Sequence, residues 1–165
     1  MTTTRRAFLA ASLSVFMLAG CGFHRRGKVT LPFNTLFLAL PTNSKVGADL
    51  KRRIGAASDV AFVTDRNNAD AILELLNDTT SRRVISLNTN GEAREYEISL
   101  VMTFRVSAPD GSEFMAPRTF RTFRNITYSE TDYLSRNNEE RLLLNEMRET
   151  LITQFLTVLS SIKKP

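Results

Sequence analysis

Hydrophobic residues along this chain fall into three patterns. The first is a nearly continuous apolar run over residues 7–19, preceded by Arg5 and Arg6. This run is too short to cross a bilayer as a helix, and it has the length of the apolar region of a signal peptide. Beyond residue 35 the apolar positions recur at helix or strand spacing, which indicates a folded domain. The sequence therefore predicts a signal peptide, residues 1–20, that is removed.

Two segments have the spacing of an amphipathic helix. In the first, Val46, Leu50 and Ile54 lie four residues apart. A turn and a capping sequence at residues 41–44 precede it, and Gly55 is expected to end it. The second segment is longer and carries a wider apolar stripe, made of Leu143, Leu144, Met147, Leu151, Ile152, Phe155, Leu156, Leu159 and Ile162. We expect a long final helix with one buried face.

Strand patterns fill most of the remaining domain. Residues 35–40 form a short apolar run that predicts a buried strand, and residues 60–63 are a candidate for another short one. After that the period becomes two. Residues 69–76 and 82–87 have the pattern of two parts of one long strand that can be bent. Residues 96–106 alternate without a break, and residues 114–126 return as a third long strand. The alternating polar positions indicate that this sheet has one wet face.

The turns between the long strands complete the predicted topology. Asn90-Gly91 is a strong hairpin signal and predicts a type I′ turn, and Pro109-Asp110-Gly111 turns the chain again. Pro117 favours an edge position for the last long strand. The economical arrangement is an α+β two-layer sandwich, with two helices on one face of a four-stranded, mostly antiparallel mixed sheet.

One domain accounts for the folded part, which we place at residues 35–165. Residues 21–34 lack a sustained period and contain Gly22, Gly27 and Pro32, so they are expected to form a tether. Removal of the signal peptide leaves 20 basic and 17 acidic residues and lowers the net charge from +5 to +3. Export makes a nucleic-acid partner improbable, and the anionic partners expected outside the cytoplasm are lipid head groups.

The chain has a single Cys and a single His. These counts exclude an internal disulfide framework, a multi-Cys zinc site and a His-cluster metal centre. There is no Ser-His-Asp set, no HExxH, no Walker A sequence and no Gly-rich dinucleotide loop. We therefore expect no enzymatic activity, no metal and no diffusible cofactor. A hydrolase that uses scattered carboxylates such as Asp65 and Asp70 is the weakest alternative.

The single Cys has a specific context. Leu18-Ala19-Gly20-Cys21 is a bacterial lipobox, which predicts covalent diacylglycerol and an N-acyl chain on Cys21 after cleavage. These chains supply the membrane anchor. Gly22 follows the Cys, whereas an Asp there retains lipoproteins at the inner membrane of enteric bacteria, so we expect the periplasmic side of the outer membrane. Residues 4–9 also resemble a twin-arginine signal, but Sec export is favoured because nothing downstream indicates a cofactor.

Arginines recur at every third position in the last strand, at Arg118, Arg121 and Arg124. In a regular strand Arg118 and Arg124 share one face and Arg121 takes the other, unless a bulge near Thr122 changes this. Guanidinium groups bind phosphate bidentately, so the group is a candidate phosphate site. The alternative is an edge strand whose charges prevent aggregation. Arg136, near the start of the last helix, is a second candidate, and its alternative is an ordinary surface charge.

Several segments together resemble the LPS-assembly lipoprotein (LptE) family. Each match is short, but all occur in the same order across nearly the whole mature chain. The matching segments are Cys21–Gly27, Asn90–Tyr96, Phe120–Phe123, Leu134–Glu140 and Glu146-Met147.

This resemblance implies two helices on a four-stranded sheet, and a lipoprotein that plugs the outer-membrane β-barrel LptD, helps it assemble and contacts lipopolysaccharide. It implies lipopolysaccharide contact at Arg136, which matches a basic residue of the family. A second basic position of the family, just before the Asn-Gly turn, is Thr89 here, and Arg82, Arg83 or Arg94 are candidates to compensate. The alternative function is a stand-alone periplasmic lipoprotein that binds anionic lipid.

Overall fold

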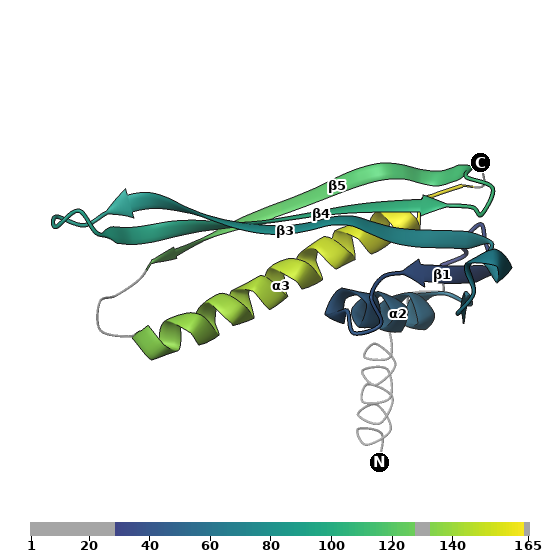
Figure 1. Cartoon of the computed structure of the whole chain (residues 1–165), viewed down its shortest axis with the longest axis horizontal. Coiled ribbons are helices and arrows are strands. Elements are labelled where there is room, and N and C mark those ends of the chain that lie inside the picture. The colour runs from purple at the N-terminus through teal and green to yellow at the C-terminus, as the bar shows by residue number, and fades with distance from the viewer. Residues whose placement is uncertain (1–28, 128–132, 164–165) are drawn as a thin grey trace, which may run out of the picture.

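The structure is a computed structural model that describes residues 29–127 and 133–163. The predicted signal peptide and Cys21 lie outside the described residues. Its elements (Figure 1) are β1 (Thr35–Ala39), α2 (Lys45–Ala57), β2 (Ala61–Val63), the 3-10 turn η2 (Arg66–Asn68), β3 (Ala71–Leu87), β4 (Ala93–Ser107), β5 (Glu113–Thr127) and α3 (Tyr133–Leu159).

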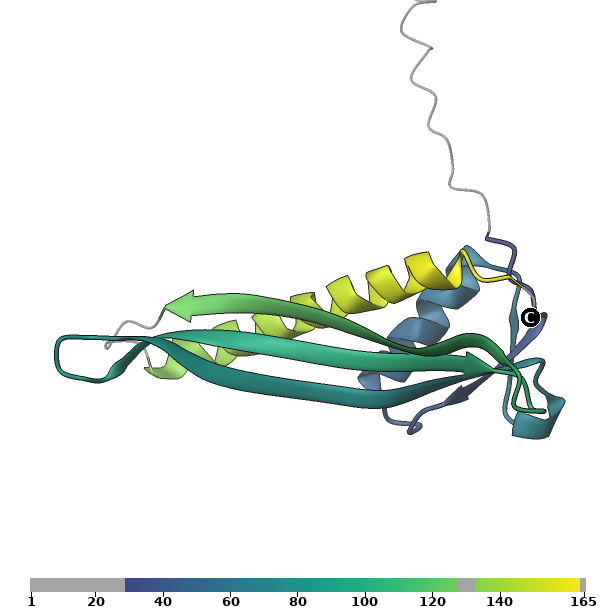
Figure 2. The same ribbon diagram turned by 90° about the horizontal axis from the view of Figure 1, so that it is seen from above.

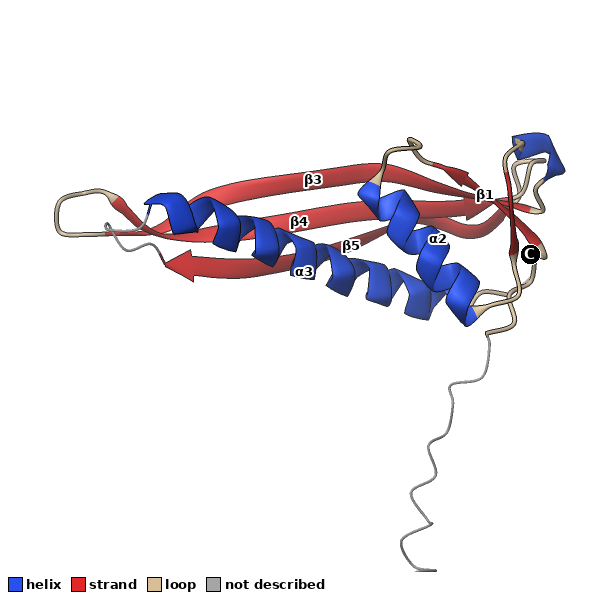
Figure 3. Cartoon of the chain, turned by 90° about the horizontal axis from the view of Figure 1, so that it is seen from below, coloured by secondary structure: helices blue, strands red, loops and turns tan. Residues whose placement is uncertain are grey.

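The described strands form one mixed sheet in the order β2-β1-β3-β4-β5. β1 pairs in parallel with both β2 and β3, and β3, β4 and β5 form an antiparallel meander. Both helices lie on the same face of this sheet (Figure 3). The predicted α+β two-layer architecture is confirmed, but the sheet has five strands and not four. β2 is the additional strand. Its three residues are too few to show the alternation that identifies a strand in a sequence.

Helix α2 begins where the capping sequence predicts. The Ser44 hydroxyl accepts a hydrogen bond from the Gly47 N–H at 3.2 Å, which satisfies one of the free donors of the first turn. The expected end at Gly55 is wrong. The helix continues to Ala57, and Ser58 caps it by donating both its N–H and its hydroxyl to the Ile54 carbonyl, at 2.9 and 2.8 Å.

The three long strands are much longer than β1 and extend beyond it as an arm (Figure 2). β1 pairs with β3 only from Ala71 to Glu74. The register between β3 and β4 shifts between Leu75 and Asn77 and again near Val84. Such irregularities bend a long strand. The distal part of β3, beyond Glu74, therefore has β4 as its partner and no described strand on its other side.

An aromatic cluster joins α3 to the sheet. The Phe104 ring of β4 stacks on the Phe155 ring of α3, with centroids 4.4 Å apart, and Phe120 of β5 meets Phe155 edge to face at 6.1 Å. Phe104 and Phe155 are completely buried. The alternating apolar residues of β4 are completely buried as well, and they are Ile98, Leu100, Met102, Phe104 and Val106. This row is the centre of the core.

The folded part begins earlier than the boundary at residue 35 that we predicted. Phe33 is 4% exposed and its ring packs edge to face against Phe114, with centroids 5.4 Å apart. The Val29 N–H donates to the Ala57 carbonyl at 2.7 Å. The second half of the predicted tether thus packs on the domain. No helix within the two described ranges is long and apolar enough to cross a membrane.

Candidate anion-binding surface

The pairing of β4 with β5 determines the faces of the three predicted arginines. Arg118 lies opposite Phe104, and Arg124 lies opposite Ile98. Directly opposed residues share a face of a sheet, and both partners are buried beneath the helices, so both arginines lie on the helix-side face. Arg121 occupies the opposite, open face. This is the distribution that a regular strand predicts.

The pairing is continuous at Thr122, where a bulge was considered. The irregularity lies instead at Pro117, between the paired positions Met115 and Arg118, because proline has no N–H to donate to the ladder. Roughly 20 Å of strand separates Arg118 from Arg124. The three arginines therefore do not form one cluster.

Arg136 lies in the first turns of α3, and its side chain is outside the described residues. α3 begins at the end of the molecule where β5 ends (Figure 1). Arg124 is close to that end of β5. The structure thus brings Arg124 and the first turns of α3 to the same end of the molecule, whereas Arg118 lies nearer the middle of β5.

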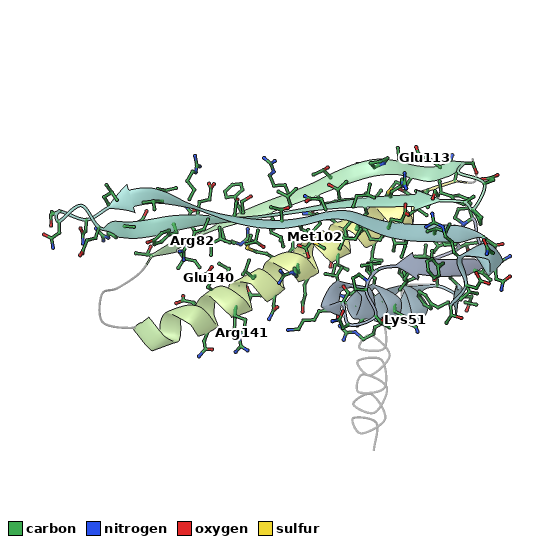
Figure 4. All side chains as sticks on the ribbon, in the orientation of Figure 1. Lys51, Arg82, Met102, Glu113, Glu140 and Arg141 are labelled. Carbon is green, nitrogen blue, oxygen red and sulfur yellow. The ribbon has the colours of Figure 1, made fainter. Side chains whose placement is uncertain are left out.

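Arg82 is a further basic residue at this end. It lies opposite Ile98, so a single row, Arg82–Ile98–Arg124, crosses the three long strands on the helix-side face. Its guanidinium carbon lies 4.9 Å from the Tyr96 ring centroid, and its Nη1 atom lies 3.7 Å from Oε2 of Glu140 in α3 (Figure 4). The Arg82 side chain is still 52% exposed. It is held in place but remains accessible to an anion.

Two strand spacings place the Cα atoms of Arg82 and Arg124 about 10 Å apart. We call the surface formed by Arg82, Arg124 and the first turns of α3 the helix-entry surface. Arg83, which follows Arg82, points to the open face and pairs with Glu97 at 3.1 Å. Among the three residues considered as replacements for the basic position at Thr89, Arg82 is therefore the one that shares a row with Arg124. Sequence reasoning missed this pairing because it depends on the register of two hairpins.

The hairpin at this end differs from the predicted type I′ turn. That turn needs a positive φ at both Asn90 and Gly91, but among the described residues only glycines have positive φ, and Gly91 has +79°. The Gly91 N–H donates to the Asn88 carbonyl at 3.0 Å, and the Asn88 N–H donates to the Glu92 carbonyl at 2.8 Å. This is a three-residue loop, a type I turn followed by a left-handed glycine.

Asn88 explains why the longer loop forms. Its side-chain oxygen accepts hydrogen bonds from the N–H groups of Asn90 and Glu92, both at 2.9 Å. These bonds shape the turn from Asn88, which lies two residues before Asn90 in the predicted turn pair. The turn at the opposite end of β4 has the same form, and the N–H and hydroxyl of Ser112 hold the pKa of Asp110 below its usual value.

The three arginines that the sequence singled out are all exposed on β5. Within the part of the chain that the structure describes, no carboxylate lies in ion-pair distance of Arg118, Arg121 or Arg124. Arg124 donates to the Phe123 carbonyl at 2.9 Å. The same part of the chain has no group of three or more His, Cys, Asp or Glu side chains placed to hold a metal ion. What the surface offers is exposed guanidinium groups beside apolar side chains.

A half-open cavity of about 520 Å³ lies between α2 and the ends of β1 and β2. Its lining is mostly apolar and includes Phe37, Leu40 and Phe62. The only charged residue in the lining is Lys51, whose ammonium nitrogen lies 5.7 Å from the Phe62 ring centroid. The lining also contains the hydroxyl groups of Thr42, Ser44 and Thr64.

Two solved structures that resemble this fold are named lipoproteins. The solution structure of an uncharacterized lipoprotein B from Nitrosomonas europaea matches with a TM-score of 0.71 and 26% identity, over 85% of this chain and 91% of that one. The crystal structure of the rare lipoprotein B from Shewanella oneidensis matches with a TM-score of 0.66 and 26% identity, over 78% of this chain and 95% of that one. The class is therefore a small α+β lipoprotein domain.

The family follows from the sequence of the domain. The family model LptE, described as lipopolysaccharide-assembly, matches residues 33–159, and the chain belongs to this family. Two relatives named LPS-assembly lipoprotein LptE support the assignment. The relative from Photorhabdus laumondii is 28% identical over 91% of this chain and 85% of its own length. The relative from Pectobacterium atrosepticum is 29% identical over 93% of this chain and 84% of its own length.

Proposed function

We propose that this chain is a non-enzymatic outer-membrane lipoprotein of lipopolysaccharide transport, anchored through lipid on Cys21 and facing the periplasm. In this role it plugs the β-barrel LptD, helps that barrel assemble and contacts lipopolysaccharide before insertion at the cell surface. The observation that supports it most is the family match over residues 33–159, which includes every described strand and the whole of α2 and α3. The lipobox that ends at Cys21 adds the expected anchor.

The helix-entry surface supplies the proposed contact with lipopolysaccharide. Phosphate groups on that lipid require exposed cations, and Arg82 and Arg124 lie in one row on the same face. Arg136 belongs to the same end of the molecule and matches the family's basic position. Tyr96, whose ring lies beside Arg82 and is only partly buried, adds an apolar surface that fits an amphiphilic ligand, whereas Ile98 is completely buried between the two arginines.

Co-purification tests the barrel partner. A tagged full-length chain, expressed from its own promoter and recovered from detergent-solubilised outer membranes, is expected to retain LptD in an equimolar complex. A Cys21→Ala variant, which cannot be acylated, serves as the control for membrane delivery. Recovery of the lipidated chain alone, together with tight binding of lipopolysaccharide by that chain, would instead favour a stand-alone anionic-lipid-binding lipoprotein.

A further inference from the structure

The outer edge of β3 is a long free sheet edge. β1 covers it only from Ala71 to Glu74, and from Leu75 to Leu87 no described strand pairs with it. Figures 2 and 3 show this part of β3 running along the side of the arm, with neither helix alongside its outer edge. A free strand edge exposes a row of N–H and C=O groups that another strand can pair with.

The other two edges of the described sheet are protected against such pairing. β2 has only three residues, and β5 has Pro117 and an irregular ladder. Exposed arginines do not distinguish the edges, because Arg82 and Arg83 are exposed on β3 as well. The free part of β3 contains no proline and no lysine. It also carries four of the exposed large hydrophobic side chains in the described structure, which are Leu76 at 49%, Val84 at 46%, Ile85 at 39% and Leu87 at 60% exposure.

The central part of this edge is regular. Between Asn77 and Val84 every residue pairs in sequence with β4, and the irregularities lie outside that segment. In such an antiparallel ladder every second residue turns its N–H and C=O away from the partner strand. The segment from Asn77 to Val84, which we call the open edge, therefore presents an uninterrupted row of backbone donors and acceptors. Only an extended polypeptide matches that row.

We propose that the open edge receives an extended segment of a protein partner, which adds a strand to the sheet. The inference rests on the proposed function, because the expected donor is the LptD polypeptide. The exposed side chains of the open edge define the chemistry of the segment. Hydroxyl or amide side chains suit the middle, opposite Thr79 and Thr80. A carboxylate suits Arg83, which already pairs with Glu97 but whose side chain is still 73% exposed. An aliphatic residue suits Val84.

A second copy of this chain fits the open edge less well. In an antiparallel pair of two copies centred on Thr80 or Ser81, the hairpin loop of one copy would lie beside the residues of β3 that already pair with β1 in the other copy. Pairing moved toward the hairpin, about Arg82 or Arg83, sets like charges directly opposite each other, which is destabilising. An extended segment of a different protein has neither problem.

Amide hydrogen exchange of the full lipidated chain tests the proposal, measured in detergent alone and in the co-purified complex with LptD. In the chain alone, every second amide of the open edge should exchange rapidly. In the complex, those same amides should slow at least tenfold, while their neighbours, which already pair with β4, change little. This period of two distinguishes strand addition from side-chain contact. The amides from Thr119 to Asn125 on the β5 edge are the matched control.

Proline variants give an independent measurement. In Thr79→Pro and Thr80→Pro one N–H faces β4 and the other faces outward, so one variant damages the fold and the other removes only an outward donor. The variant that removes the outward N–H should keep the circular dichroism spectrum of the unsubstituted chain. The amount of LptD that co-purifies with it should fall at least tenfold.

The possible outcomes are distinct. A complex whose open edge exchanges as fast as in the free chain overturns the inference and leaves the proposed function intact. Slow exchange in the chain alone, with a doubled mass, assigns the edge to a second copy and also overturns it. Failure to form any LptD complex overturns the proposed function and the inference with it.

Discussion

Single residues decide the local geometry of the hairpin between β3 and β4. Gly91 has a φ of +79°, in the left-handed region that residues other than glycine adopt at a cost of about 1–2 kcal/mol. Space is not the constraint, because a Cβ at Gly91 would meet no atom within 4 Å. The sequence identified this glycine correctly as a turn residue. It could not identify the turn type, which depends on the side chain of Asn88.

A pair of Gly→Ala substitutions separates conformation from helix propensity. Gly91→Ala is expected to lower the free energy of unfolding by about 1 kcal/mol because of its backbone conformation. Gly55→Ala is expected to be neutral or to stabilise by about 0.5–1 kcal/mol, because Gly55 lies inside α2 and the new methyl would meet Phe62 at an ordinary 3.5 Å. Urea denaturation of both variants measures this. Equal destabilisation would contradict the assigned helix end.

The arginines can be compared in matched pairs that remove the same charge from opposite faces. Arg82→Ala with Arg124→Ala removes two cations from the helix-side face, and Arg83→Ala with Arg121→Ala removes two from the open face. We expect the first pair to weaken binding of purified lipopolysaccharide at least tenfold, because each charge-assisted bond contributes about 1.5–3 kcal/mol. Equal losses of lipopolysaccharide affinity in the two double variants would mean that only the net charge matters, and not the face on which the arginines lie.

At the scale of the elements, the periodicity of apolar residues was sufficient to predict the three-stranded meander and the helices α2 and α3. β4 alternates so regularly because one face packs beneath the helices while the other is wet, and such a strand is visible in the sequence. β2 and the parallel pairing around β1 were less visible. A three-residue strand carries too little pattern, and its place depends on contacts with β1 that lie far away in the sequence.

The aromatic contact between α3 and the sheet makes a prediction at this scale. Phe155→Ala removes a fully buried ring that stacks on Phe104 and touches Phe120, so it should cost about 3–5 kcal/mol of stability. Leu142→Ala, on the exposed side of the same helix at 60% exposure, should cost less than about 1 kcal/mol. Thermal and denaturant unfolding of the two variants would reveal the difference. Similar losses would mean that α3 does not pack as described.

For the whole molecule, the sequence predicted a two-layer α+β architecture, and the fold agrees, whereas the lipobox lies outside the described residues and stays a prediction. The candidate anion-binding surface was predicted only in part. The sequence predicted that Arg118 and Arg124 share one face and that Arg121 takes the other, and the sheet agrees. The sequence did not predict that Arg82 lies in a row with Arg124, from a strand more than forty residues away. Such a row depends on strand register, which a one-residue change in a loop would alter.

The central claim is that this lipoprotein serves lipopolysaccharide assembly at the outer membrane. Its most direct test is the amount of newly made lipopolysaccharide that reaches the cell surface when the chain is depleted in its own host. We expect surface lipopolysaccharide to fall as the chain is lost, with the lipid accumulating before the outer leaflet, and a plasmid copy should restore it. Unchanged arrival of lipopolysaccharide at the surface after complete depletion would contradict the account.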